Sequence, residues 1–101
     1  MKQRVMITGA TDGIGRATAL ALAGSGVDLI LHGRNAARLE VLQEELQGMV
    51  AGIAVATVLA DLSSLAQVRR LADEVLERFP GLDVLINNAG VFKLDQTTSP
   101  D

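Results

Sequence analysis

Glycines spaced closely after a short apolar run are the first residues whose type and spacing could do chemistry. The segment Thr8-Gly9-Ala10-Thr11-Asp12-Gly13-Ile14-Gly15 follows Val5-Met6-Ile7 and leads into small and apolar residues. Glycine allows backbone angles and close approaches to a ligand that other residues do not. A helix beginning near Gly13 would aim unpaired N–H groups and its positive dipole end at the turn. This arrangement favours a loop that binds the pyrophosphate of a dinucleotide, although such glycines can also serve a turn alone.

A basic residue ends the second apolar run. The segment His32-Gly33-Arg34-Asn35 contains no acidic residue, whereas NAD-selecting sites place one here for the adenosine ribose. Gly33 leaves room, and Arg34 carries a permanent positive charge that suits the 2′-phosphate of NADP. The alternative is that Arg34 is an ordinary solvated residue at a helix start. We expect NADP as the cofactor, in preference to NAD.

The third apolar run ends in Asp61-Leu62. The Asp61 carboxylate could accept a hydrogen bond from the adenine amino group, and the Leu62 backbone could complete the contact with the base edge. The alternative is that Asp61 serves the start of the following helix. Because Ser64 can supply that cap, we favour the adenine role.

Composition excludes several other functions. The chain has 101 residues, 49% of them hydrophobic, with a net charge of −3, so nothing favours nucleic acid or an anionic membrane as a partner. It has no cysteine and one histidine, which excludes thiolate and multi-histidine metal sites. No apolar stretch is long enough to span a bilayer as a helix. We expect a cytoplasmic protein.

Apolar strand-like runs alternate with longer amphipathic segments along the chain. Strands are predicted at 4–8, 27–32, 53–60 and 83–87, and helices at 13–23, 36–47 and 65–79. Asn35 is the predicted N-cap of the second helix, and Gly48 its C-terminal stop. Ser64 and Gln67 fit a capping box for the third. The apolar stripe predicted for that helix is Leu65, Val68, Ala72, Val75 and Phe79.

This alternation predicts an α/β fold, a three-layer doubly wound (Rossmann-like) parallel sheet. About four strands in the order 3-2-1-4 would put the switch point between the first and the fourth strand. Ligands bind at the carboxyl ends of such strands, where the glycine turn and Asn87-Asn88-Ala89-Gly90 would lie. We expect one partial dinucleotide-binding domain over residues 1–101.

Together these four segments resemble the short-chain dehydrogenase/reductase family. Thr-Gly-x-x-x-Gly-x-Gly after the first strand and Asn-Asn-Ala-Gly after the fourth are both typical of it. The resemblance covers essentially the whole chain, but only the amino-terminal half of a family member. It implies an NADP-dependent oxidoreductase that transfers hydride between the nicotinamide and a carbonyl or alcohol carbon.

The resemblance also implies roles for individual residues. Gly9, Gly13 and Gly15 would shape the pyrophosphate turn, with Thr11, Asp12 and Ile14 lining it. Arg34 with Asn35 would meet the 2′-phosphate, and Asp61 with Leu62 would hold adenine. Asn88, Ala89 and Gly90 would border the adenosine ribose and brace the central strands. Some NADP-preferring members carry a basic residue inside the glycine turn, where this chain has Asp12.

The catalytic half of the family pattern is missing. Family members use a tyrosine as general acid/base with a lysine shortly after it, and this chain contains no tyrosine. No catalytic residue is therefore named, and we expect a truncated amino-terminal portion. The alternative is a non-catalytic nucleotide-binding or interaction module. The fourth strand would keep an unpaired outer edge, so self-association through that edge is expected.

Overall fold

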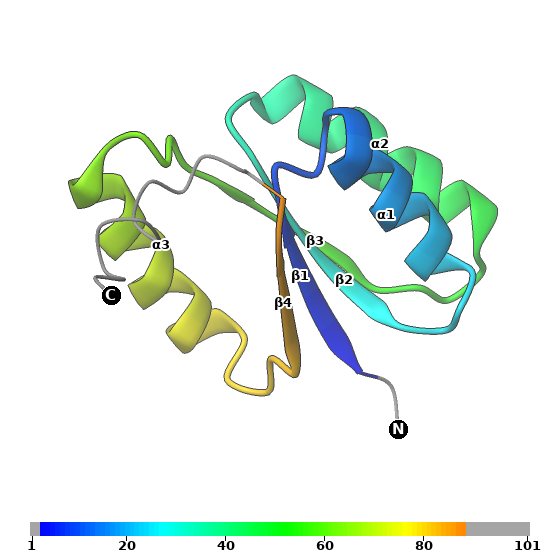
Figure 1. Cartoon of the computed structure of the whole chain (residues 1–101). Helices are drawn as coiled ribbons and strands as arrows, with labels where there is room; N and C mark the ends of the chain where they lie inside the picture. The colour runs from blue at the N-terminus through cyan, green and yellow to red at the C-terminus, as the bar shows by residue number, and fades with distance from the viewer. Residues whose placement is uncertain (1–2, 89–101) are drawn as a thin grey trace, which may run out of the picture.

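Within residues 3–88, four parallel strands make one sheet in the order β3-β2-β1-β4 (Figure 1). The structure, a computed structural model, describes residues 3–88. The elements follow one another as β1 (Arg4–Thr8), α1 (Gly13–Ala23), β2 (Asp28–Gly33), α2 (Ala36–Met49), β3 (Val55–Leu59), α3 (Leu65–Arg78) and β4 (Val84–Asn87). The predicted fold class and strand order are confirmed.

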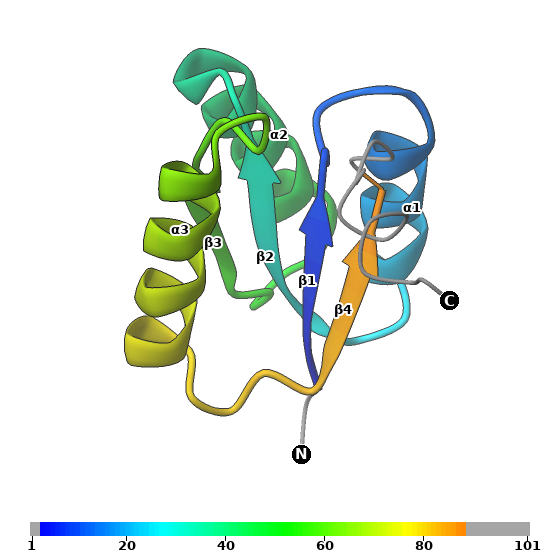
Figure 2. The ribbon, with the colours of Figure 1, turned by 60° about the vertical axis from the view of Figure 1, so that its left-hand side comes forward.

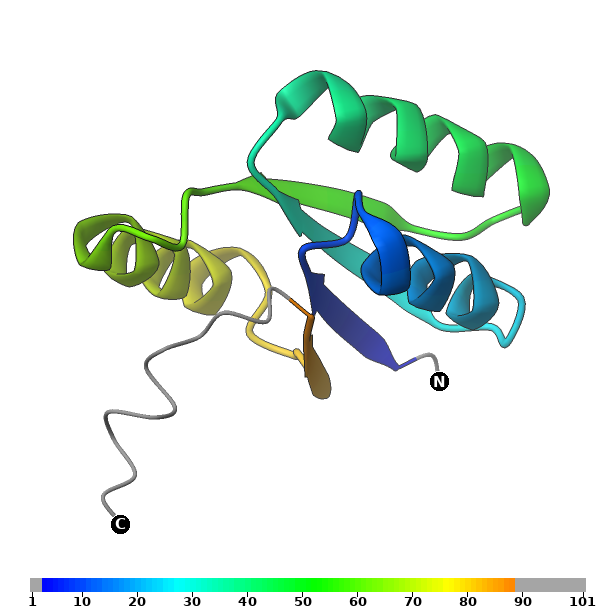
Figure 3. The same ribbon diagram turned by 45° about the horizontal axis from the view of Figure 1, so that its top comes forward.

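Helices cover both faces of the sheet (Figures 2 and 3). Alternate strand residues such as Ile7 and Leu31 pack with Leu46 of α2 in one apolar cluster, which also includes the buried alanines of α1. The intervening residues, among them Met6 and Ile30, pack in a second cluster with Leu71 and Val75 of α3. Both faces of the two central strands, β1 and β2, are thus buried, which explains their near-continuous apolar sequence.

The second helix begins as predicted but continues past the predicted stop. The Asn35 side chain accepts a hydrogen bond from the Arg38 N–H at 3.0 Å, so the N-cap is confirmed. Gly48 lies inside α2, which ends at Met49, and its predicted role as the stop is wrong. The chain reverses at Gly52 instead, where φ is 83° and a glycine is favoured.

The third helix is turned relative to the predicted stripe. Leu71 and Val75 are buried, whereas Leu65 is 65% exposed and Ala72 is also exposed. Leu71 and Ala72 are adjacent in α3, so the helix can turn either of them toward the sheet. Burying the larger leucine removes more apolar area from water than burying the alanine. The predicted positions of Val75 and Phe79 are confirmed, whereas those of Leu65 and Ala72 are wrong.

Ser64 caps α3, but only one arm of the predicted capping box forms. The Ser64 Oγ accepts from the Gln67 N–H at 3.3 Å. The Gln67 Oε1 accepts from the Asp61 N–H at 3.0 Å, while the Ser64 N–H donates to the Asp61 carbonyl. The Gln67 side chain therefore ties the end of β3 to α3 instead of closing the box.

The fourth strand is an edge of the sheet. It pairs with β1, and its side chains Val84 and Leu85 are exposed by 38% and 58%. The Asp83 carboxylate accepts from the Arg4 N–H at 2.9 Å and fixes the beginning of β4 beside β1.

Within residues 3–88, no helix has the length and apolar character needed to cross a membrane.

Candidate functional site

The glycine turn between β1 and α1 depends on a close backbone approach. Gly9 has φ of 62° and Gly13 φ of 45°, both in the left-handed region that favours glycine. Gly15 is buried in α1 against the turn. A Cβ on Gly15 would overlap the Gly9 carbonyl oxygen and lie 2.9 Å from the Gly9 carbonyl carbon. The turn can fold tightly onto the helix only because position 15 has no side chain.

The start of α1 lacks the side-chain cap that the other helices have. Asp12 is its N-cap residue and makes no capping hydrogen bond, whereas Asn35 caps α2 and Ser64 caps α3. The Asp12 Oδ1 accepts instead from Arg38 Nη1 at 2.8 Å. The N–H groups of the first turn have no partner within their own helix. They lie at the carboxyl end of β1 and can donate to an anion.

His32, at the end of β2, joins the turn to β3. Its Nδ1 accepts from the Gly9 N–H at 3.0 Å, and its Nε2 lies 2.9 Å from the Ala60 carbonyl. Its own carbonyl accepts from the Ala10 N–H at 2.9 Å. Since Nε2 must donate to a carbonyl and Nδ1 must accept from an N–H, this geometry requires the neutral Nε2–H tautomer.

Burial also keeps this imidazole neutral. The side chain of His32 is only 2% exposed. Desolvation lowers its pKa, the hydrogen bond to the Ala60 carbonyl opposes that shift, and the nearby Arg34 charge lowers the pKa further. At pH 7 the residue is therefore an uncharged connector between backbone segments.

The segment after β2 carries two arginines. Arg34 is exposed, as the prediction requires, and the Asn35 Oδ1 is occupied in capping α2. The space that Gly33 was expected to leave open is filled by α2, since a Cβ there would be 3.1 Å from the Leu39 side chain. Arg38, on the first turn of α2, reaches the glycine turn through Asp12. A guanidinium therefore lies at the turn despite the acid at position 12.

The carboxyl end of β3 carries the predicted adenine residues. The Asp61 Oδ1 accepts from the Ser63 N–H at 3.0 Å and from the Ser63 Oγ at 2.8 Å. Both bonds lower the pKa of Asp61, and the bond from the Ser63 backbone N–H has the larger effect. Asp61 thus does serve the turn before α3, as the alternative held. An ionised carboxylate has several acceptor positions, so it can accept a further donor. Leu62 is half-buried against the cluster below α3.

Thr8 ties β1 to Asn87, the last residue of β4, and to Asn88 directly after it. Its Oγ1 donates to the Asn87 Oδ1 at 2.9 Å and accepts from the Asn88 N–H at 2.9 Å. The Asn88 Nδ2 is buried and finds no partner among the described residues. Ala89 and Gly90, which were predicted to border the ribose, lie outside those residues.

Parallel pairing brings these segments to one edge of the sheet. The glycine turn, Arg34, Asp61 and Asn88 each follow the carboxyl end of a different strand. Thr11 lies beside the β2 end, with its Cγ2 3.4 Å from where a Cβ on Gly33 would be. Ile14 is 76% exposed on the first turn of α1. Over residues 3–88, no cluster of three or more acidic or histidine side chains could hold a metal ion.

Three residues at this edge escape prediction from the sequence: Thr8, His32 and Arg38. The polar types of Thr8 and His32 at the ends of buried strands are the available signal for two of them. Arg38 gives no such signal, because its partner Asp12 is distant in the sequence. All three act through contacts that only the folded chain creates.

Sequence and structure comparisons agree with this geometry. The model of the short chain dehydrogenase family matches residues 3–100. The chain belongs to the short-chain dehydrogenase family. It is 42% identical over 98 residues to sepiapterin reductase of Chlorobaculum tepidum, covering 90% of this chain and 39% of that protein.

Solved structures of other proteins superpose on the fold. L-sorbose reductase of Gluconobacter frateurii, complexed with NADPH and L-sorbose, matches with a TM-score of 0.80 and 32% identity over 89% of this chain and 34% of its own. A short-chain dehydrogenase of Sphingobium yanoikuyae in complex with NADPH matches with a TM-score of 0.78 and 38% identity over 87% and 34%. The chain spans about a third of the length of the curated relatives it matches.

Proposed function

We propose that this chain forms the NADP-binding part of an oxidoreductase that transfers hydride between the nicotinamide and a carbonyl or alcohol carbon. The observation that carries the proposal is the uncapped start of α1 beneath a turn that Gly15 allows to fold tightly. Two structures of the same fold, an L-sorbose reductase and a short-chain dehydrogenase, are complexed with NADPH. Anions bind at such helix ends because the N–H groups and the helix dipole act together.

The residues around the turn fit the rest of a dinucleotide. The exposed Arg34 and Arg38 offer guanidinium groups to a 2′-phosphate, and Asn35 fixes the start of α2 that carries Arg38. Asp61 and Leu62 provide acceptor and backbone groups for adenine. The buried, unpartnered Asn88 Nδ2 can donate to a ribose hydroxyl. Ala89 and Gly90 keep their proposed place beside the ribose.

In this proposal the 101 residues bind and orient the dinucleotide, and no proton transfer is assigned to them. A bound nicotinamide dinucleotide supplies or accepts the hydride. The 101 residues include no tyrosine to act as the acid/base of the family, so we assign no catalytic residue here. The turn at residues 9–15 would fix the pyrophosphate, and the ends of β2 and β3 would fix the adenosine.

Removing the Arg34 charge tests the cofactor preference. NADP, NAD and 2′,5′-ADP are titrated into the chain by calorimetry or by NMR shift changes. We expect the 2′-phosphate ligands to bind more tightly, and Arg34→Ala to weaken them about tenfold to a hundredfold, because a charge-assisted bond contributes about 1.5–3 kcal/mol. NAD affinity should stay unchanged.

The matched control is Arg69→Ala, which removes the same charge from an exposed position on α3. It should leave the preference intact. Equal affinity of the unsubstituted chain for NAD and NADP would refute the role given to Arg34.

We also propose that the isolated chain self-associates through the outer edge of β4. This edge strand carries the exposed Val84 and Leu85, and an unpaired edge can bind a second copy by backbone hydrogen bonds. Sedimentation velocity at micromolar concentration should show dimers or larger species. A monodisperse monomer with one sharp, cooperative melting transition would contradict it.

A further inference from the structure

We propose that His32 is a positioning residue that locks the glycine turn onto the ends of β2 and β3, and so sets the turn for the pyrophosphate. The part about pyrophosphate rests on the function proposed above; the lock itself does not. His32 lies on β2, between β1 and β3 in the sheet, and its imidazole reaches a backbone group beyond each of those neighbours.

Two consecutive N–H groups of the turn point at this one residue. The Gly9 N–H donates to the imidazole Nδ1 at 3.0 Å, and the Ala10 N–H donates to the His32 carbonyl at 2.9 Å. These bonds fix the glycine turn at Gly9 and Ala10. The N–H groups at the start of α1 remain available to a ligand. Gly9 is half-buried, and leaving its N–H without a partner would cost free energy, so the turn is held to this arrangement.

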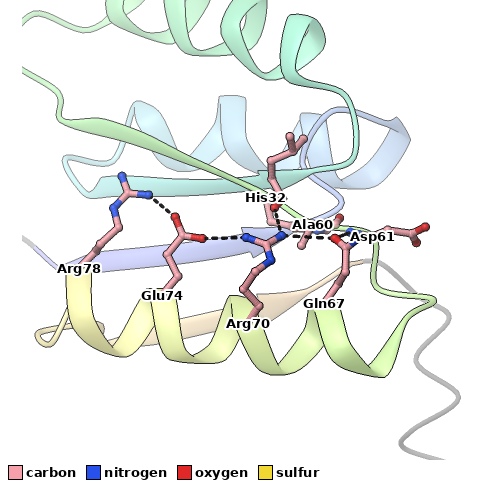
Figure 4. A network of polar contacts seen from close by, with 8 residues as sticks. His32, Ala60, Asp61, Gln67, Arg70, Glu74 and Arg78 are labelled. Carbon is pink, nitrogen blue, oxygen red and sulfur yellow. Dashed lines mark hydrogen bonds and ion pairs between the residues drawn. The ribbon is translucent and has the colours of Figure 1, made fainter.

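The far side of the imidazole joins a polar chain that ends on α3 (Figure 4). The Ala60 carbonyl accepts from Nε2, and the next residue, Asp61, donates its N–H to the Gln67 Oε1. Arg70 also donates to the Gln67 Oε1, at 3.3 Å, and to the Leu59 carbonyl at 3.0 Å. The pyrophosphate turn and the adenine end of β3 are thus connected through His32.

The shape of histidine suits this connection. Its acceptor Nδ1 corresponds in reach to the amide oxygen of asparagine, and its donor Nε2 corresponds to the amide nitrogen of glutamine. Either substitution keeps one of the two contacts. The charged groups near the ring do not disturb these two hydrogen bonds. The Arg34 charge disfavours a second proton on the imidazole, and the Asp61 carboxylate accepts from Ser63 instead.

The first test needs no substitution and no ligand. The ring-nitrogen NMR shifts of His32, measured above pH 7 on the whole chain, should report the Nε2–H tautomer, and the Gly9 amide should be protected from hydrogen exchange. A ring protonated on Nδ1, or an unprotected Gly9 amide, would overturn the lock.

The second test separates positioning from folding. The probes are NADP, which carries a pyrophosphate, and adenosine 2′-monophosphate, which does not. His32→Gln, which loses the Gly9 contact, should expose the Gly9 amide and weaken NADP about tenfold, as expected for one lost buried hydrogen bond, with the monophosphate within about twofold. His32→Asn, which keeps that contact, should stay within about threefold for NADP.

Equal loss of both probes in His32→Gln would indicate general loosening of the site and overturn the proposal, as would equal NADP losses in the two variants. If the unsubstituted chain binds neither probe, the proposed function fails, and the ring tautomer and Gly9 exchange still decide whether the lock exists.

Discussion

Gly15→Ala is expected to remove the contribution of the pyrophosphate turn to NADP binding and to lower the free energy of unfolding by about 3 kcal/mol. The added methyl group would overlap the Gly9 carbonyl oxygen and lie 3.2 Å from the Ala10 Cα, both backbone atoms that cannot swing away. Overpacking of this kind costs about 1–3 kcal/mol and occasionally more. To relieve the overlap, the turn must move off α1, which removes the phosphate site.

Denaturant unfolding and ligand titration measure the two effects. Gly48→Ala is the matched control, because Gly48 is exposed inside α2 and a Cβ there meets no atom within 4 Å. Alanine at a helix interior is favoured over glycine by up to about 1 kcal/mol, so this variant should be slightly more stable. A Gly15→Ala chain with unchanged stability and binding would show that the turn does not depend on the close approach.

Local signals account for the elements that sequence predicts well. The sequence predicts the observed bounds of the first helix because glycines stand at both of its ends and its residues are small and apolar. The strand order followed from alternation of strands and helices, which allows few parallel topologies with right-handed crossovers. The strand β2 is predicted one residue early, and β3 is predicted longer than observed, since its apolar flanks Ile53 and Ala60 are buried without pairing in the sheet.

Tertiary packing decides the features that the sequence did not predict: the buried face of α3, the end of α2 and the long-range contacts at the site. Both flanks of α3 offer apolar residues, and only contact with the sheet selects Leu71 over Ala72 and Leu65. Glycine is a weak helix breaker when the helix is packed, so Gly48 stays helical. At the site, the spacing of the glycines identified the turn. The Asp12–Arg38 pair and the two contacts of His32 join residues far apart in sequence, which no local pattern indicates.

Thr8→Val should loosen the junction between β1 and β4. The buried Thr8 hydroxyl donates to Asn87 and accepts from the Asn88 N–H, and valine keeps the shape but supplies neither bond. We expect the free energy of unfolding to fall by about 2 kcal/mol, since each bond contributes about 1 kcal/mol and the polar partners lose their pairing. Amide exchange at Asn88 should accelerate, because its N–H loses this acceptor.

Two control variants, Thr8→Ser and Thr57→Val, separate the effect of the Thr8 hydroxyl from that of its methyl group. Thr8→Ser keeps the hydroxyl and should preserve Asn88 protection, at the cost of one buried methyl group, about 1 kcal/mol. Thr57→Val makes the same chemical change on β3, where the half-buried threonine side chain makes no hydrogen bond within residues 3–88, and should be neutral or stabilising. Equal effects of Thr8→Val and Thr57→Val would mean that the hydroxyl of Thr8 does not hold β4. In that case the position of Asn88 must depend on its pairing with neighbouring backbone, and the proposed ribose contact would lose its anchor on β1.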